Sequence, residues 1–170
     1  GITGLAERYG VTPQQVTYFT HGTTVGVNTV IQRRGITLCL FTTRGFEDVL
    51  EVARLKMPDP YDLFSGRPEP LVTRDRVFSI DERMLFDGSV DTPLAGGSVD
   101  AAIEGVRAVG GEGVVVALLH AYRNPTHEQR VAEIIKAKAP ELTVTCASEV
   151  WPVIREYERT VTAVVAGYVQ

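Results

Sequence analysis

A polar turn near the start of the chain has the residue types that bind anions. Its members are His21, Gly22, Thr23 and Thr24. A β-type run at 16–19 precedes the turn and a helical run follows it, so the turn stands at the amino end of a helix. Free N–H groups and the positive end of the helix dipole favour an anion there, and threonine hydroxyls add donors. The sequence therefore predicts the wall of an anion pocket, with a turn that binds nothing as the alternative.

The helix after this turn is expected to hold the polar groups in place. Either threonine of the turn is a suitable N-cap, and Gly35 stands where a left-handed helix stop is expected. Asn28 follows Thr24 by four residues, so both side chains project from one helical face beside the turn. The apolar residues of this helix, which are expected to face a core, are Val27, Val30 and Ile31.

A second candidate for chemistry follows an apolar strand at 114–119. His120 comes at the carboxyl end of this strand, and open α/β sheets bind ligands outside the carboxyl ends of their strands. The strand order decides whether His120 shares a crevice with His21, and the sequence leaves that order open. Further along, Glu128 is expected in the first turn of a helix, where its charge suits the helix dipole. Residues 155–160 are expected to form an exposed, ion-paired helix face.

Alternating β-type and helical runs predict an α/β protein with a mainly parallel sheet flanked by helices. The expected strands are 36–42, 77–86, 114–119 and 142–145, and the expected helices are 43–53, 99–109, one starting at Pro125, and 153–169. The strand 114–119 is apolar throughout, so it should be central and parallel. Asp87-Gly88 predicts a hairpin, and the prolines of 55–75 predict a long loop. The last helix is expected to bury Tyr157, Val161, Val164, Val165 and Tyr168.

The composition is that of one globular domain, 1–170, with 44% hydrophobic and 22% charged residues. The net charge of −4 does not favour nucleic acid as a partner, and no apolar run reaches membrane-spanning length. Cys39 and Cys146 are expected to be buried, reduced thiols of a cytoplasmic protein. The three histidines lack the spacing of metal ligands, so no metal site is predicted. Residues 44–83 carry seven cations, which either meet an anionic ligand or form a solvated face.

Six ordered segments together resemble the amino-terminal domain of the hydantoinase A/5-oxoprolinase family, of the N-methylhydantoinase kind. They are 21–28, 42–50, 59–63 with 70–72, Glu82-Arg83, 124–128 and 154–160. They cover most of the chain, and their order makes them specific when they are taken jointly. Because apolar helical patterns run to both ends of these residues, we expect the native protein to be longer at both ends.

The resemblance implies an actin-like (ribonuclease H-like) ATPase fold and ATP-dependent hydrolysis of a cyclic amide through phosphorylation of its carbonyl oxygen. ATP and magnesium would be the cofactors. The partners would be a small cyclic amide, the rest of the polypeptide and a hydantoinase B-type subunit. One alternative is a β-subunit of an ATP-dependent ketone carboxylase, which bicarbonate consumption would distinguish. The other is a non-catalytic scaffold domain on an actin-like fold.

The resemblance also indicates site residues. His21 is the candidate catalytic residue, and the residues expected to line the phosphate or substrate cleft are Gly22, Thr23, Thr24, Asn28, Arg83, Arg155 and Arg159. For the three arginines a structural role is an equal alternative. The two glycine-rich phosphate motifs of the family are absent from these residues, so the isolated fragment is expected to be inactive.

Overall fold

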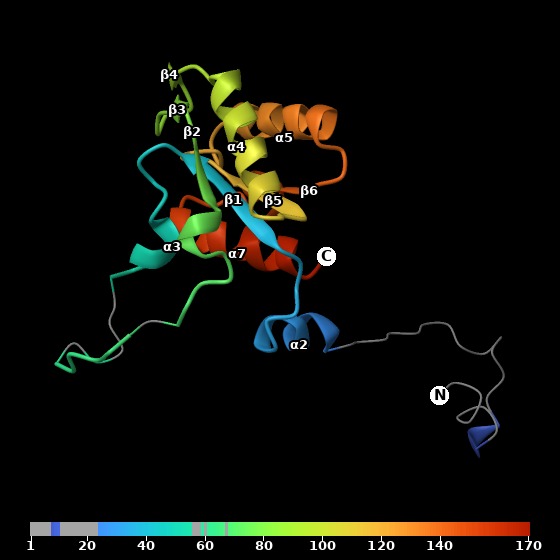
Figure 1. Cartoon of the computed structure of the whole chain (residues 1–170). Coiled ribbons are helices and arrows are strands. Elements are labelled where there is room, and N and C mark those ends of the chain that lie inside the picture. Colours follow the sequence, from blue (N-terminus) through green and yellow to red (C-terminus); the bar gives the residue numbers. More distant parts are fainter. Residues whose placement is uncertain (1–7, 11–23, 56–58, 60, 67) are drawn as a thin grey trace.

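The computed structural model describes residues 8–10, 24–55, 59, 61–66 and 68–170 (Figure 1). Its centre is a four-stranded parallel sheet with the strand order β2-β1-β5-β6. The strands are β1 (Leu38–Thr43), β2 (Val77–Ile80), β5 (Gly113–Ala117) and β6 (Thr143–Cys146). Because β5 lies between β1 and β6 and is parallel to both, the predicted central strand is confirmed. The α/β class with a mainly parallel sheet is confirmed as well.

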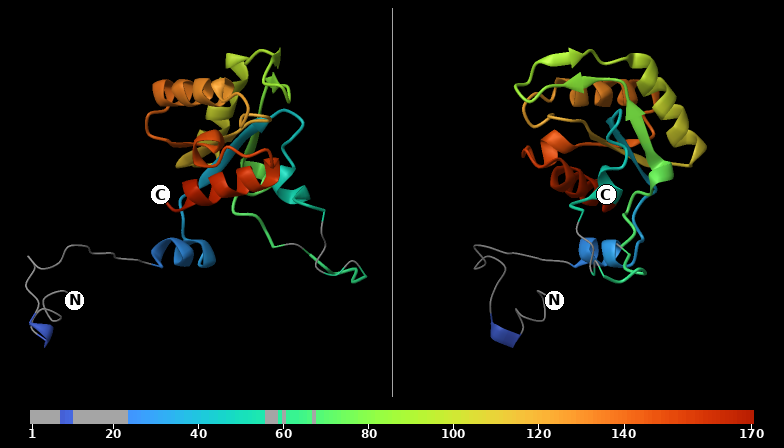
Figure 2. Two further views of the ribbon diagram at one scale, coloured as in Figure 1. Left: turned by 180° about the vertical axis from the view of Figure 1, so that it is seen from behind. Right: turned by 90° about the vertical axis from the view of Figure 1, so that its left-hand side faces the viewer.

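Helices cover both faces of the sheet (Figure 1, Figure 2). α4 (Gly96–Ala108) and α5 (Thr126–Lys138) pack on one face, and α7 (Glu156–Tyr168) and α3 (Val49–Val52) pack on the other. Side chains alternate along each strand, so Phe41 joins the core under α4 and α5 while Leu40 joins the core under α7. Both faces are buried, which explains why these strands are continuous apolar runs.

The strand predicted at 77–86 is interrupted. β2 ends at Ile80, and the chain resumes as β3 (Arg83–Met84), which pairs antiparallel with β4 (Val90–Thr92). Between them the Asp81 N–H donates to the Ser98 hydroxyl over 3.0 Å, and the Glu82 side chain is buried. The break falls at the two acidic residues Asp81 and Glu82, a residue type that is depleted in strands. The hairpin predicted at Asp87-Gly88 is confirmed, with Gly88 at φ +89°.

α2 (Val25–Ile31) begins after Thr24, its N-cap residue, and lies at the end of the sheet where β1 starts (Figure 1). The prediction that its apolar residues face a core is wrong for Val27 and Ile31, which are 61% and 74% exposed, whereas Val30 packs partly against the core. The predicted left-handed stop at Gly35 is also wrong, because Arg33 takes that conformation at φ +51°. The predicted strand at 16–19 lies outside the described residues.

Gly35 has a packing role instead. A Cβ at this position would overlap the backbone carbonyl oxygen and the ring of Tyr168, near the end of α7. The chain between α2 and β1 therefore touches the end of α7 more closely than any side chain allows.

The remaining elements differ from the predictions mainly at their ends. Within 43–53 only α3 is helical, because a turn with Gly45 at φ +89° comes first. The described part of 55–75 is irregular, as predicted, and leads to the short 3₁₀ helix η2 (Arg74–Arg76) before β2. The N-cap residue of α5 is Pro125 and not Asn124 as predicted, because the helix starts one residue later, at Thr126. The Asn124 side-chain oxygen accepts from the Thr126 N–H and hydroxyl at 3.2 and 2.8 Å just before this helix. β6 runs into the four-residue helix α6 (Ala147–Val150).

The buried face of α7 is rotated from the predicted stripe. Val164 and Tyr168 are buried as expected, whereas Val165 is 36% exposed. The other buried residues of this helix are Arg159, Thr160, Ala163 and Gly167. A helix face that contains a buried arginine cannot be read from apolar periodicity alone, which explains the error.

Both cysteines, Cys39 and Cys146, are free and buried, as predicted. Burial raises the pKa of the Cys39 thiol to about 11 and that of Cys146 to about 12. No helix in the described ranges combines the length and the apolar character that a membrane span requires.

Candidate functional site

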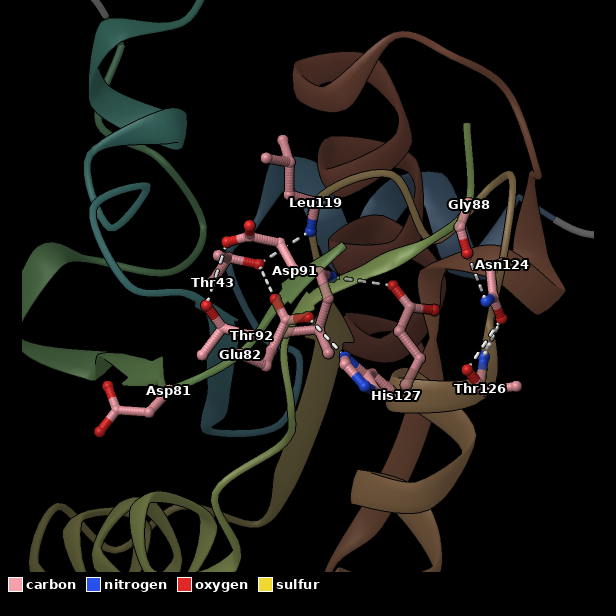
Figure 3. Close-up of polar contacts among 12 residues, drawn as sticks. Thr43, Asp81, Glu82, Gly88, Asp91, Thr92, Leu119, Asn124, Thr126 and His127 are labelled. Carbon is pink, nitrogen blue, oxygen red and sulfur yellow. Dashed lines mark hydrogen bonds and ion pairs between the residues drawn. The ribbon is translucent and has the colours of Figure 1, made fainter. Parts of the chain in front are cut away.

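Polar side chains gather where the parallel strands end. The chain leaves β1 at Thr43, passes Glu82 shortly after β2, and reaches Leu119 and His120 after β5. Thr43, Glu82 and Leu119 lie together at the carboxyl edge of the sheet (Figure 3), and His120 follows Leu119 directly in the chain. Ligands of open α/β sheets bind outside this edge, so it is the candidate functional site of the described chain.

One chain of hydrogen bonds joins four segments of the chain at this edge (Figure 3). The Leu119 N–H donates to the Thr43 hydroxyl oxygen over 2.9 Å, and the Thr43 hydroxyl contacts one carboxylate oxygen of Glu82. The other oxygen of Glu82 lies 2.7 Å from Nδ1 of His127, in the first turn of α5. The Glu82 side chain is fully buried and that of His127 is 13% exposed. Neither Glu82 nor His127 was predicted as a site residue, although both lie in segments that carry the family resemblance.

A second buried carboxylate ties two strand ends together. Glu128 accepts the Leu118 N–H through Oε1 and the Ser148 N–H through Oε2, both over 2.9 Å. Burial raises the pKa of Glu128, against the hydrogen bonds from Ser148 and Leu118 and the charge of Arg159. Glu128 is in the first turn of α5 as predicted, but it points into the protein rather than toward solvent.

Arg159 is the largest fully buried side chain of the described residues. Its guanidinium donates to the Leu118 carbonyl over 2.8 Å and to the Val153 carbonyl over 2.9 Å, and it pairs with Glu156. The prediction of an exposed ion-paired face at 155–160 is therefore wrong for this residue. Its sequence neighbours gave no signal of burial, because its pair with Glu156 has the i,i+3 spacing of an exposed helix face. The two backbone carbonyls that also accept from its guanidinium belong to no sequence motif.

His120 takes a left-handed backbone conformation, φ +58°, directly after the central strand. Its N–H donates to Oε1 of Glu156 over 3.2 Å, and its ring lies edge-on to Tyr122 at 6.0 Å. In the part of the chain that the structure describes, Nδ1 of His120 is buried without a hydrogen-bond partner. The prediction that His120 stands at a strand's carboxyl end is confirmed.

The predicted arginines of this edge differ in what they contact. The Arg83 guanidinium lies 5.0 Å from the centroid of the Phe46 ring, and within the described ranges no carboxylate is paired with it. Arg155 is exposed at the N-cap position of α7. The guanidinium groups of Arg83 and Arg155 can therefore bind an anionic group, whereas that of Arg159 is already bound to protein partners.

Thr24 and Asn28 lie elsewhere. They are exposed on α2, where the Asn28 amide nitrogen is 3.4 Å from the Thr24 hydroxyl oxygen, so the predicted shared face is confirmed. α2 is at the end of the sheet where β1 begins, and Arg83 is at the opposite end (Figure 1). The structure therefore does not bring these two predicted groups together. His21, Gly22 and Thr23 lie outside the described residues.

A hollow near this edge has a volume of about 440 Å³. It lies between β2 and α4, and its polar lining includes Arg44, Asp81 and Ser98. Arg44 and Asp81 pair with each other, and this contact raises the pKa of Arg44 and lowers that of Asp81. Three of the seven cations of 44–83 thus have acidic partners, since Arg54 also pairs with Glu158 and Arg74 with Asp48.

The sequence and the fold of the chain both match known proteins. The fold is an α/β sheet with a polar carboxyl edge, and residues 1–139 match the family described as the hydantoinase/oxoprolinase N-terminal region. The chain belongs to this family. The family resemblance found in the sequence is therefore confirmed.

Two relatives have similar sequences over most of the chain. Caprolactamase subunit alpha of Pseudomonas jessenii is 34% identical over 99% of this chain, and acetophenone carboxylase gamma subunit of Aromatoleum aromaticum is 34% identical over 88%. The matched region makes up 25% and 22% of those proteins, so the chain spans about a quarter of their length.

Two solved structures share the fold. The crystal structure of ATP-dependent caprolactamase from Pseudomonas jessenii has a TM-score of 0.84 and 34% identity, covering 98% of this chain and 25% of that one. The nucleotide-free structure of acetone carboxylase has a TM-score of 0.84 and 28% identity, covering 96% and 25%. The α/β architecture of this chain is thus common to caprolactamase and acetone carboxylase.

Proposed function

We propose that this chain is the amino-terminal part of an ATP-dependent enzyme that hydrolyses a cyclic amide by phosphorylating its carbonyl oxygen. The observation that carries the proposal is the likeness to caprolactamase, which extends over nearly the whole chain in sequence and in fold. An amide resists attack by water because electron donation from its nitrogen makes the carbonyl carbon a poor electrophile. Transfer of a phosphoryl group to the carbonyl oxygen makes that carbon more electrophilic. Water then adds to the carbon, the C–N bond breaks as the nitrogen takes up a proton, and hydrolysis of the resulting acyl phosphate gives the carboxylate and inorganic phosphate.

The carboxyl edge is the proposed place of the reacting carbonyl and of the transferred phosphoryl group. Arg83 and Arg155 support this, because guanidinium groups suit phosphate oxygens and neither of these forms a direct ion pair with a carboxylate of the described chain. The charge of Glu158 acts on Arg155 without such a contact. Arg159 is proposed to act as a positioning residue, since it holds the backbone at Leu118 beside His120. The isolated 170 residues are proposed to be inactive without the rest of the polypeptide.

The turn at 21–24 is proposed as a separate anion-binding region. Thr24 and Asn28 support this proposal, because their hydroxyl and amide groups are exposed on one helix face. They lie at the other end of the sheet from Arg83, so they would bind a different group from the one held at the carboxyl edge. His21, Gly22 and Thr23 would complete that region, and the variant His21→Ala tests whether its histidine takes part in turnover.

Magnesium is proposed to accompany ATP and to neutralise the charge of its phosphates. Within the described residues no three acidic, histidine or cysteine side chains are close enough to hold a metal ion. The ion would therefore be bound chiefly through phosphate oxygens and water, which is common for magnesium in nucleotide sites. A hydantoinase B-type subunit is the proposed partner.

A ketone-carboxylating activity is the second candidate, and the likeness to acetophenone carboxylase gamma subunit and to acetone carboxylase favours it. Here the phosphorylated oxygen would be that of an enolate. The two reactions share ATP and a carbonyl substrate but differ in their need for bicarbonate.

The test is ADP release by the full natural polypeptide that carries this chain, together with its partner subunit. Caprolactam, hydantoin, N-methylhydantoin and 5-oxoproline form one set of substrates, and acetone and acetophenone with bicarbonate form the other. ADP release that depends on a cyclic amide supports the first proposal, and release that depends on ketone and bicarbonate supports the second. If neither set stimulates ADP release, both enzymatic proposals are overturned in favour of a scaffold domain.

A further inference from the structure

The hydrogen bonds around Thr43 have a fixed direction. A backbone N–H only donates, so the Thr43 oxygen must accept from Leu119. The single hydroxyl proton of Thr43 is then directed at the other contact of that oxygen, which is the Glu82 carboxylate. Glu82 thus receives one donor from Thr43 and has its second oxygen available for His127.

The same reasoning sets the tautomer of His127. The carboxylate of Glu82 only accepts, so Nδ1 of His127, 2.7 Å away, carries the proton of this hydrogen bond. In the neutral imidazole the lone pair is then on Nε2. Within the described ranges the imidazole has no other hydrogen-bond partner, and its side chain is partly exposed. A carboxylate that orients an imidazole in this way prepares the far nitrogen to accept a proton.

Both proposed reactions require the loss of a proton. The atom beside the carbonyl carbon is N–H in a cyclic amide and C–H in a ketone. When the carbonyl oxygen takes up a phosphoryl group, this proton must leave so that the electrons of the N–H or C–H bond form the new double bond to the carbonyl carbon. A base at the carboxyl edge of the sheet would serve either substrate.

We propose that His127 is this general base, with Glu82 and Thr43 as positioning residues; the inference rests on the proposed function. Nε2 accepts the proton from the atom beside the carbonyl carbon, and the carbonyl π electrons move to oxygen. The oxygen forms a bond to the γ-phosphorus of ATP, and the bond from that phosphorus to the bridging oxygen of ADP breaks. The products are ADP, the phosphorylated imidate or enol, and His127 in its imidazolium form, whose charge is balanced by Glu82.

His120 is the competing histidine of this edge. Its Nδ1 is buried without a partner in the described chain, and its N–H is held by Glu156. No carboxylate there orients the imidazole, and the guanidinium of Arg159 lies over the ring of its neighbour Tyr122 at 5.6 Å. The geometry therefore assigns the base to His127.

His127→Asn is the first variant to test, in the full polypeptide with its partner subunit. The asparagine amide can donate to Glu82 as Nδ1 does, but it has no nitrogen lone pair that can accept a proton. We expect kcat for ADP release to fall roughly 10²- to 10⁴-fold while KM changes little. In His127→Ala, added imidazole should restore part of the lost kcat, which a purely structural role would not allow.

The positioning residues have matched controls. Thr43→Val removes the hydroxyl and should lower kcat, whereas Thr43→Ser keeps it and should recover most of the wild-type kcat. Glu82→Gln should lower kcat with an unchanged KM, and Glu133→Gln, an exposed residue of the same helix as His127, should leave both unchanged. Unfolding temperature is recorded for every variant.

Three outcomes distinguish a failure of the proposed function from a failure of the proposed role of His127. A wild-type protein that shows no carbonyl-dependent ADP release overturns the proposed function and this inference together. Wild-type turnover with full kcat in His127→Asn overturns the inference alone. A folded His127→Ala variant whose lost activity is not restored by imidazole also counts against a base at this position.

Discussion

Glu128 accepts the backbone N–H of Leu118 over 2.9 Å and so joins the start of α5 to the end of the central strand. Its second oxygen accepts from Ser148, beyond the end of β6. One carboxylate thus satisfies two backbone donors that would otherwise be buried without partners, at the edge where the candidate site lies. The first two predictions concern this residue.

Replacing Glu128 by alanine should destabilise the fold by on the order of 3 kcal/mol, because two buried N–H groups lose their acceptor. Urea-induced unfolding measures the change. Glu133→Ala on the same helix removes an exposed carboxylate paired with Arg130 and should change stability by less than about 1 kcal/mol. Equal losses in the two variants would show that the buried acceptor has no special role.

The pH dependence of stability should carry the signature of Glu128. Burial raises its pKa in the folded state, so folding favours the protonated carboxyl. Its contribution is complete below the pKa of the unfolded chain, about 4.3, and is lost as pH rises through the folded pKa. Relative to Glu128→Gln, which cannot titrate, the wild type should therefore lose free energy of unfolding as pH rises above about 4.3. A difference that stays constant with pH would contradict this.

The elements with local signatures are the ones that can be predicted from the sequence. The apolar run that forms β5 and the Asp87-Gly88 hairpin depend on a few adjacent residues, and both are confirmed. Parallel pairing also follows from the alternation of strands and helices. The exposed side chains of α2 were mispredicted because periodicity reports an apolar face but not what covers it.

The candidate site is harder to predict, because its partners are distant in sequence. Thr43 and Glu82 are 39 residues apart, and Glu82 and His127 are 45 apart. Charged residues are almost never fully buried unless they are paired. A charged residue whose partner cannot be recognised in the sequence is therefore expected at the surface. Glu82, Glu128 and Arg159 are buried only because strand ends supply backbone and side-chain partners that no local spacing reveals.

Gly35→Ala should destabilise the protein by roughly 1 to 3 kcal/mol, because a methyl group there overlaps the Tyr168 carbonyl and the backbone must move. Gly26→Ala is the control. Gly26 lies within α2 with open space around its would-be Cβ, so alanine should be neutral or stabilise by up to about 1 kcal/mol. Thermal unfolding of both variants gives the comparison, and a stable Gly35→Ala protein would mean that α7 does not pack against this segment.

The two thiols should be inert in the folded protein. Cys39 and Cys146 are buried, with pKa values raised to about 11 and about 12, so almost no thiolate forms near neutral pH. Iodoacetamide at pH 8 should label neither residue under native conditions and both in urea, as measured by mass spectrometry. Rapid native labelling of either cysteine would show that its surroundings open on the time scale of the reaction.

Arg83→Ala should raise KM for ATP or for the carbonyl substrate about 10-fold or more, because a charge-assisted hydrogen bond contributes roughly 1.5 to 3 kcal/mol. The prediction depends on its guanidinium, which rests over Phe46 with no paired carboxylate in the described residues. Arg74→Ala is the matched control, since that arginine is already paired with Asp48 and should leave KM unchanged. Arg83→Lys keeps the charge but not the planar fork, so an intermediate KM is expected. If Arg83→Ala and Arg74→Ala have the same KM as the wild type, the phosphate or substrate is held by other residues.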